Sequence, residues 1–340
     1  MSLIHIKDLH KDFQILNRRP GIGGAFRDLF SGNYRTVEAV AGISFDIEPG
    51  EIVGYIGPNG AGKSTTIKMM TGILKPTSGT ILVNDLVPYD NRIRQAQIMG
   101  VVFGQRTQLW WDLPVIESFR LLKEIYKVDE KTFDQHMSMF NDLVNLQALY
   151  SQQVRTLSLG QRMLCDITAS FLHNPQVVFL DEPTIGLDIS IKAKIRSVIQ
   201  ELNRTRNTTI ILTTHDLGDV EALCKRIIII DKGTILYDGN VRKVNALFGA
   251  YRTLKLQLDD FSDETRAKLE ADLHEHFGSD SAISLGQTEE FWTDLTIDQA
   301  KTPLSDVLGF VMSNFKVSDV RIVEIAMENV VQKIYEGALG

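Results

Sequence analysis

Short runs of apolar residues recur through the first 240 positions, and segments with helical spacing lie between many of them. Helical spacing marks residues 190–204 and 216–224, and a longer, mostly helical insert covers residues 115–149. Strands that alternate with helices predict a mainly parallel sheet, which binds its ligands at the carboxyl ends of its strands. The runs with strand length lie at residues 2–9, 43–47, 52–56, 81–83, 99–103, 177–180 and 209–214.

After about residue 245, three segments in which apolar and polar residues alternate predict strands, and the two segments between them have helical spacing. This β-α-β-α-β order predicts a small α+β accessory domain at 246–340, after a larger α/β domain at 1–245. Within the larger domain, residues 106–165 are expected to form a helical subdomain. The accessory strands are expected at 254–258, 291–297 and 320–325, and the accessory helices at 264–277 and 304–315.

The composition is that of a folded protein with a sizeable core, since 44% of the 340 residues are hydrophobic and 23% are charged. The 36 basic and 43 acidic residues give a net charge of −7 without any basic cluster, which argues against a nucleic-acid partner. Cys165 and Cys224 form no disulfide or zinc pattern and are expected to be buried. No apolar run reaches the ~18 residues of a membrane span, and no signal peptide is recognised, so the chain is predicted to be cytoplasmic.

A glycine-rich segment joins the strand at 52–56 to a helix. Its glycines let backbone N–H groups converge on a phosphate, and the helix N-terminus adds partial positive charge. Lys63 is placed to reach the β- and γ-phosphates of a nucleotide, and the Ser64 hydroxyl is placed to ligate Mg²⁺. The spacing therefore predicts a phosphate-binding loop. The loop comprises Gly57, Pro58, Asn59, Gly60, Ala61, Gly62, Lys63, Ser64 and Thr65.

Titratable side chains follow two of the other strands. Asp181 and Glu182 end one apolar strand, and His215 follows the next. Because the carboxyl ends of parallel strands meet at one edge of a sheet, all three are expected near the phosphate-binding loop. Asp181 is then placed to orient water ligands of Mg²⁺ opposite Ser64, and Glu182 to polarise an attacking water.

In their order along residues 2–240, these motifs resemble those of the ATP-binding subunits of ABC transporters. The resemblance implies an ABC-type nucleotide-binding domain, an ATPase activity, and ATP and Mg²⁺ as cofactors. Gln105 resembles the Q-loop glutamine, residues 157–161 (LSLGQ) the signature motif, residues 177–182 the Walker B strand with its catalytic glutamate, residues 186–188 the D-loop, and His215 the switch histidine.

The resemblance also implies a role for each of these residues. Gln105 is expected to ligate the metal together with Ser64 and Asp181, and to contact the attacking water. His215 is expected to hydrogen-bond the γ-phosphate. Gln105, Glu182 and His215 then form the catalytic set.

The signature motif implies a second ATPase subunit, because in this family it completes the nucleotide site of a facing protomer. Ser158 and the Gly160 backbone N–H are expected to stabilise the γ-phosphate across the interface of a homodimer or heterodimer. Gln161 and Asp188 are expected at the same composite site. Leu159 occupies the third position, where the usual LSGGQ sequence has glycine.

The resemblance also implies an aromatic side chain just upstream of the second strand that stacks on adenine. An insertion at residues 14–36 interrupts the usual spacing and leaves two candidates. Tyr34 keeps the distance to Ala39 and Val40 and is favoured, whereas Phe13 keeps the distance to the first strand. The insertion itself is interpreted as a solvated loop, and a contact with a membrane partner is the alternative.

The LSLGQ variant, the insertion and residues 104–112 (GQRTQLWWD) resemble a bacterial exporter-type branch with separately encoded permeases. Trp110 and Trp111 lie where a permease element is expected to dock. Their alternative role is packing inside the helical insert. The chain is thus predicted to be an exporter ATPase at the cytoplasmic face of the cell membrane, with an integral membrane permease as partner.

Three further functions compete with this interpretation. Within the class, an importer ATPase is the alternative. Outside it, a soluble ABC-type ATPase acting on ribosomes or DNA is disfavoured by the single cassette, the absence of sustained heptads and the acidic balance. A kinase or GTPase does not explain why LSLGQ precedes the Asp-Glu strand and His215.

Overall fold

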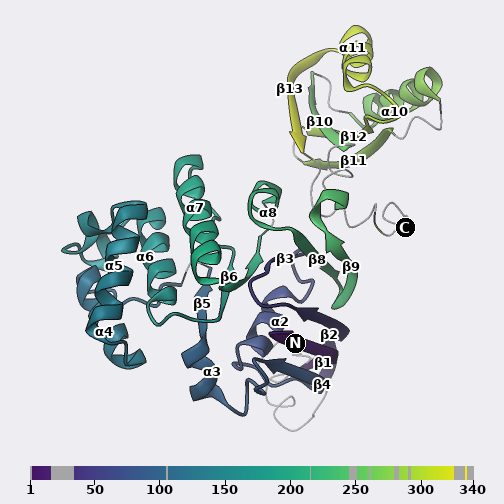
Figure 1. The fold of residues 1–340 in the computed structure, drawn as a ribbon. Helices are drawn as coiled ribbons and strands as arrows, with labels where there is room; N and C mark the ends of the chain where they lie inside the picture. Colours follow the sequence, from purple (N-terminus) through teal and green to yellow (C-terminus); the bar gives the residue numbers. More distant parts are fainter. Residues whose placement is uncertain are drawn as a thin grey trace, which may run out of the picture. The chain divides into compact units, whose positions relative to one another are not determined.

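A computed structural model gives the structure of the chain. It describes residues 2–16, 34–104, 106–214, 216–244, 251–259, 262–278, 283–289, 292–324 and 334. Three subjects of prediction, namely Gln105, His215 and residues 17–33 of the insertion, lie outside the described residues. The chain divides into two compact units, Met1–Val241 and Arg242–Gly340, and each is considered by itself (Figure 1).

The first unit contains a six-stranded sheet in the order β5-β6-β7-β3-β8-β9. Its neighbouring strands are parallel except β8 and β9, so the predicted mainly parallel sheet is confirmed. Valine and isoleucine dominate the central strands, which are buried on both faces. The strands are β3 (Ile52–Ile56), β5 (Met99–Phe103), β6 (Val177–Asp181), β7 (Thr209–Thr213), β8 (Arg226–Asp231) and β9 (Thr234–Asn240).

A second, antiparallel sheet of the first unit has the order β2-β1-β4. Strands are predicted at 2–9 and 43–47, but β1 and β2 extend well beyond these ranges. Between Ile6 and Asp12 the pairing of β1 with β2 shifts register repeatedly, and each irregularity changes which side chains share a face. The alternation of apolar and polar positions is lost there, which hid the full strand from the pattern. The strands are β1 (Ile4–Leu16), β2 (Tyr34–Ile47) and β4 (Ser78–Val83).

Three helices, α4, α5 and α6, gather into a helical subdomain beside the parallel sheet (Figure 1). The predicted helical insert is confirmed, with Pro114 before the first turn of α4 and Asp129 capping α5. Among the described helices, none combines the length and the apolar composition that crossing a bilayer requires. The helices are α2 (Lys63–Met70), α3 (Arg92–Ile98), α4 (Val115–Tyr126), α5 (Glu130–Val144), α6 (Leu159–Phe171), α7 (Ile189–Arg206) and α8 (Leu217–Leu223), with 3₁₀ turns η1 (Leu146–Leu149) and η2 (Val154–Thr156).

A histidine joins the helical subdomain to the sheet. His173 stacks on Tyr126 at the end of α4, with ring centroids 3.9 Å apart. Its Nε2 atom lies 2.9 Å from the carbonyl oxygen of Met99 at the start of β5. Burial lowers the pKa of His173 to about 4, so the ring is neutral at physiological pH.

Cys165 and Cys224 are both buried, as predicted.

The second unit is an antiparallel sheet in the order β11-β12-β10-β13, connected as β-α-β-β-α-β. This connection order is that of a ferredoxin-like fold. The predicted α+β architecture is confirmed, but β11 was not predicted, because a register irregularity between Leu285 and Thr288 breaks its alternation. Leucines of β10 and β12 pack against both helices. The elements are β10 (Tyr251–Leu258), α10 (Asp263–Phe277), β11 (Ile283–Glu289), β12 (Trp292–Asp298), α11 (Leu304–Asn314) and β13 (Val317–Glu324).

Candidate functional site

The loop between β3 and α2 is confined by backbone on two sides. A Cβ atom on Gly57 would lie 2.1 Å from the carbonyl oxygen of Ile230, and one on Gly62 would lie 2.5 Å from that of Ala39. Gly62 also has a φ of 106°, which side chains other than glycine rarely adopt. These two positions therefore require glycine if the loop is to keep its shape.

Lys63 lies inside this loop. Its side chain is buried, and Nζ donates hydrogen bonds to the carbonyl oxygens of Gly57, at 2.6 Å, and Pro58, at 3.0 Å. The N-terminus of α2 has no side-chain cap, because Gly62 occupies the capping position. A cation and uncapped backbone N–H groups at one point make an anion-binding arrangement.

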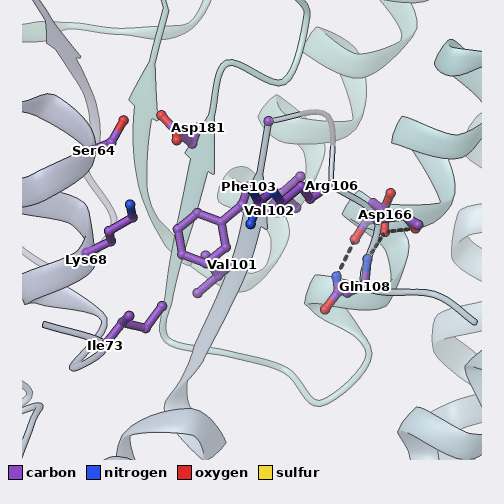
Figure 2. Close-up of a pocket in the computed structure, with 12 residues that line it drawn as sticks. Ser64, Lys68, Ile73, Val101, Val102, Phe103, Arg106, Gln108, Asp166 and Asp181 are labelled. Atoms are coloured by element: carbon purple, nitrogen blue, oxygen red, sulfur yellow. Dashed lines mark hydrogen bonds between the residues drawn. The ribbon is translucent and has the colours of Figure 1, made fainter. Parts of the chain in front are cut away.

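A cavity of about 630 Å³ opens beside the loop (Figure 2). Ser64, at the start of α2, and Asp181, at the end of β6, both line it, so the structure brings these two predicted metal ligands to one space. An oxygen pair of this kind suits Mg²⁺. Gly104 and Arg106, the neighbours of Gln105, also line the cavity. Its full lining is Ser64, Lys68, Ile73, Val101, Val102, Phe103, Gly104, Arg106, Thr107, Gln108, Asp166 and Asp181.

Thr213, at the end of β7, holds the two acidic residues at and directly after the end of β6, Asp181 and Glu182. Its hydroxyl donates to Asp181 Oδ1 at 2.6 Å and accepts from the Glu182 backbone N–H at 3.1 Å. Glu182 has a φ of +52°, a left-handed conformation that is unusual for glutamate. Its N–H also donates to the Thr213 carbonyl oxygen at 3.0 Å, which fixes this conformation. Thr213 was not predicted as a site residue, because its contacts join strands that are distant in sequence.

A buried carboxylate organises the residues on either side of His215. Asp219 of α8 accepts hydrogen bonds from the hydroxyl groups of Thr184 and Thr214. Arg196 of α7 donates to the same carboxylate at 2.6 Å and balances its charge. Asp219 is fully buried, and this network ties the segment after Glu182 to the residue preceding position 215.

The LSLGQ residues form the N-terminus of α6. Ser158 caps the helix by accepting from the Gln161 backbone N–H at 3.3 Å, and the Gln161 side chain accepts from the Ser158 N–H at 2.9 Å. This reciprocal pair is a capping box, which fixes the helix start. Of the described residues that line the cavity, none comes from 157–161. The capping box thus holds Ser158 and Gln161 together at the helix start, and neither residue belongs to the described lining of the cavity.

The D-loop segment packs against this helix start. A Cβ atom on Gly160 would lie 2.8 Å from Ile191 Cγ2 of α7, so only glycine fits there without displacement. Leu159 lies half-buried with Cδ2 near Gly186. Asp188 caps α7 by accepting from the Ile191 N–H at 3.0 Å. The leucine of LSLGQ thus lies beside the D-loop glycine, where a Cβ atom on Gly186 would be 3.5 Å from Leu159 Cδ2.

The two candidate aromatic residues lie at different positions along the pairing of β1 with β2. Phe13 is opposite Val37, whereas Tyr34 is opposite Leu16. Ala39 of β2 borders the phosphate-binding loop, and at ~3.3 Å per residue Val37 lies about 7 Å and Tyr34 about 17 Å from it along the strand. The strand register therefore places Phe13 nearer to the loop.

Trp110 and Trp111 lie on the surface of the helical subdomain, 39% and 49% exposed. The Arg162 guanidinium lies 5.4 Å from the centre of the Trp111 ring. Both rings are thus partly covered by the helical subdomain and partly exposed on its surface.

Together, the strand–loop–helix phosphate site and the acidic strand end define a P-loop ATPase of the α/β class. The family profile described as "ABC transporter" matches residues 40–185. The ABC transporter ATP-binding protein NatA of Bacillus subtilis (strain 168) is 31% identical over 210 residues, which cover 62% of this chain and 85% of NatA. The chain therefore belongs to the ABC transporter family, and it is an ABC-type ATPase.

Another relative agrees on the family, and solved structures agree on the fold. The linearmycin resistance ATP-binding protein LnrL of B. subtilis (strain 168) is 31% identical, over 66% of this chain and 71% of LnrL. ABC transporter A family member 1 of Dictyostelium discoideum is also 31% identical, but the chain spans only 27% of its length. Among solved structures, cbiO1 from Clostridium perfringens, described as part of the ABC transporter complex cbiONQ, superposes with a TM-score of 0.59 at 25% identity, over 72% of this chain and 91% of cbiO1. A dimeric bacterial ABC transporter cassette superposes with a TM-score of 0.58 at 24% identity, over 70% of this chain and 99% of that chain.

Proposed function

We propose that two copies of this chain close around two ATP molecules and that the dimer drives export through a separate membrane permease. The observation that carries the dimer is the separation of two half-sites. Lys63 and Ser64 belong to the phosphate-binding loop, whereas Ser158 and Gly160 lie at the start of α6 and do not contribute to the described lining of the cavity. A second copy, facing the first, supplies the missing half.

Each half-site has a defined part in hydrolysis. The phosphate-binding loop and Lys63 hold the β- and γ-phosphates. Ser64, Asp181 and Gln105 would hold Mg²⁺, which would neutralise charge on the phosphates. Glu182 accepts the proton of the attacking water, with its backbone held by Thr213.

The other residues act on the γ-phosphate. His215 donates a hydrogen bond to it within one subunit. Ser158 and the Gly160 N–H approach the same phosphate from the facing subunit, where the N-terminus of α6 adds partial positive charge. Gln161 supports Ser158 through the capping box, and Asp188 holds the D-loop at the interface.

Changing Ser158 tests the dimer. In a Glu182→Gln background with ATP and Mg²⁺, light scattering is expected to detect a dimer. Ser158→Asp keeps a good helix cap but places a negative charge against the γ-phosphate, so we expect dimerisation to weaken at least about tenfold. Ser158→Asn, a neutral cap of the same size as aspartate, is the matched control and is expected to retain the dimer. Equal behaviour of the two variants would contradict the proposed contact.

Phe13 is proposed as the adenine platform in preference to Tyr34, because the strand register brings it nearer to the loop. Phe13→Ala is expected to raise the KM for ATP about tenfold, since an aromatic contact contributes roughly 1 kcal/mol beyond its buried area. Tyr34→Ala is the control and is expected to change KM by less than about twofold. Steady-state hydrolysis assays distinguish the two. If Tyr34→Ala raised the KM for ATP more than Phe13→Ala did, Tyr34 would be the side chain that stacks on adenine.

The permease is proposed to dock on the helical subdomain. Trp110 and Trp111 are exposed there, and large aromatic residues are favoured as interface anchors. This arrangement places the chain at the cytoplasmic face of a bacterial membrane. Export is favoured over import by the resemblance to a resistance ATP-binding protein, since resistance is achieved by removing a compound from the cell.

A further inference from the structure

A buried acid of α6 has no part in the proposed chemistry. Asp166 is only 4% exposed, and burial raises the pKa of its carboxyl to about 6. Keeping an ionisable group in such a place costs stability unless its polar atoms are satisfied. The side-chain bonds that satisfy Asp166 come from outside α6, which indicates what the residue does.

Three hydrogen bonds join Asp166 to the segment that follows β5 (Figure 2). Oδ1 accepts from the Thr107 hydroxyl at 2.8 Å and from the Gln108 backbone N–H at 3.0 Å. The Asp166 carbonyl oxygen accepts from Gln108 Nε2 at 2.9 Å. The Thr107 hydroxyl also accepts from the Leu109 N–H at 3.1 Å, so the whole turn is held against α6.

The segment held in this way is a wall of the ATP cavity. Thr107, Gln108 and Asp166 all line the cavity that contains Ser64 and Asp181. Residues 106–108 directly follow position 105, where the proposed metal ligand stands. A displacement of this wall would reach Asp166 through its hydrogen bonds to Thr107 and Gln108.

The same helix carries the signature motif at its other end. Asp166 lies seven residues after Leu159, which is two helical turns, or about 10 Å, along one face of α6. The hydrogen-bonded backbone of α6 connects Asp166 to Ser158 and Gly160 at the start of the helix. A displacement of the turn at 106–109 therefore has a direct structural route to these two residues.

We propose that Asp166 is a positioning residue that couples the wall of one ATP site to the signature motif that the same subunit offers to the other site. This inference rests on the proposed ATP dimer. The cavity wall shifts when nucleotide and metal bind, Asp166 carries the shift to α6, and Ser158 moves into reach of the partner's γ-phosphate. The coupling makes binding of the two ATP molecules cooperative.

The hydrogen bonds from Thr107 and Gln108 require an acceptor oxygen on the side chain at position 166, not a negative charge. An Asp166→Asn variant retains a side-chain oxygen for Thr107 and Gln108, whereas Asp166→Ala leaves both donors without this acceptor. The charged group that acts on the carboxylate is Arg162, on the same helix, and Arg106 lies in the same cavity lining. The pair of variants therefore separates hydrogen bonding from electrostatics.

The test measures ATP hydrolysis and ATP binding by the full chain. Asp166→Ala is expected to lower kcat about tenfold or more and to reduce the Hill coefficient for ATP from near 2 to near 1. The Kd of the monomer for ATP is expected to stay within about twofold, because no phosphate-binding group changes. Asp166→Asn is expected to restore both kcat and cooperativity to within about threefold of the unchanged chain.

Thr168→Ala is the matched control, because Thr168 is equally buried on α6 but its hydroxyl donates to the Leu164 carbonyl oxygen of its own helix. It is expected to keep the Hill coefficient. If Asp166→Ala does not fold, Thr107→Val removes the hydroxyl from the other side and is expected to give the same loss of cooperativity.

The outcomes distinguish this inference from the proposed function. A chain that hydrolyses ATP without ever dimerising contradicts the proposed function itself. A chain that dimerises with ATP, and whose Asp166→Ala and Thr107→Val variants keep their cooperativity, overturns the coupling role alone. A loss of cooperativity in Thr168→Ala of the same size would also overturn it, because the effect would then be one of helix stability.

Discussion

Replacing Glu182 with glutamine is expected to lower the turnover of ATP about 10²–10⁴-fold, the range that loss of a general base produces. Glutamine has the same size but cannot accept the proton of the attacking water. Two hydrogen bonds to Thr213 hold the backbone N–H of Glu182, and the substitution does not alter them, so the phosphate site is expected to keep its shape. The Kd for ATP is therefore expected to change by less than about threefold. Release of phosphate and equilibrium binding of ATP, measured on the same preparation, check both parts.

Glu117→Gln is the control for this variant. Glu117 lies on the surface of α4 and pairs with Arg120, so its change alters net charge equally but leaves the site intact. It is expected to hydrolyse ATP at the unchanged rate. Turnover by Glu182→Gln within fivefold of the unchanged chain would show that another group activates the water.

Lys63→Ala is expected to weaken ATP binding about a hundredfold, since hydrogen bonds to charged groups are worth roughly 1.5–3 kcal/mol each. Lys63 is the cation that the loop encloses, with Nζ on the carbonyl oxygens of Gly57 and Pro58. When ATP binds, Lys63 is expected to exchange these contacts for phosphate oxygens. Isothermal titration with ATP and Mg²⁺ measures the loss directly.

The charge-matched control is Lys131→Ala, an exposed lysine of α5. It is expected to leave the Kd unchanged. Thermal unfolding identifies any Lys63→Ala variant that has lost its fold. If a folded Lys63→Ala protein bound ATP with unchanged affinity, the loop would not be part of the nucleotide site.

The pattern of apolar and polar residues was sufficient to predict strands that are buried along their whole length. β3, β6 and β7 are short and largely apolar, and buried strands of this kind are recognised from composition alone. The loop after β3 was also predictable, because glycine is required at positions such as Gly62 by local backbone geometry. Local rules act over a few residues, so they leave a signal in the sequence.

The pattern failed where pairing between distant segments decides the structure. The length of β1 and the presence of β11 depend on register irregularities that interrupt alternation. The same limit applies to the site. Thr213 and Asp219 were not predicted, because their contacts link elements tens of residues apart. Asp166 was also missed, although an acid among the apolar residues of a helix is a signal that could have pointed to such a contact.

The measurement that tests the transporter role most directly is the capture of the partner. A tagged Glu182→Gln chain is expressed in its native host, the membranes are solubilised in mild detergent with ATP and Mg²⁺, and the co-purifying proteins are identified by mass spectrometry. A polytopic membrane protein in stoichiometric amount is the predicted result. Ribosomal proteins or DNA-bound factors in that amount, with no membrane protein, would contradict it.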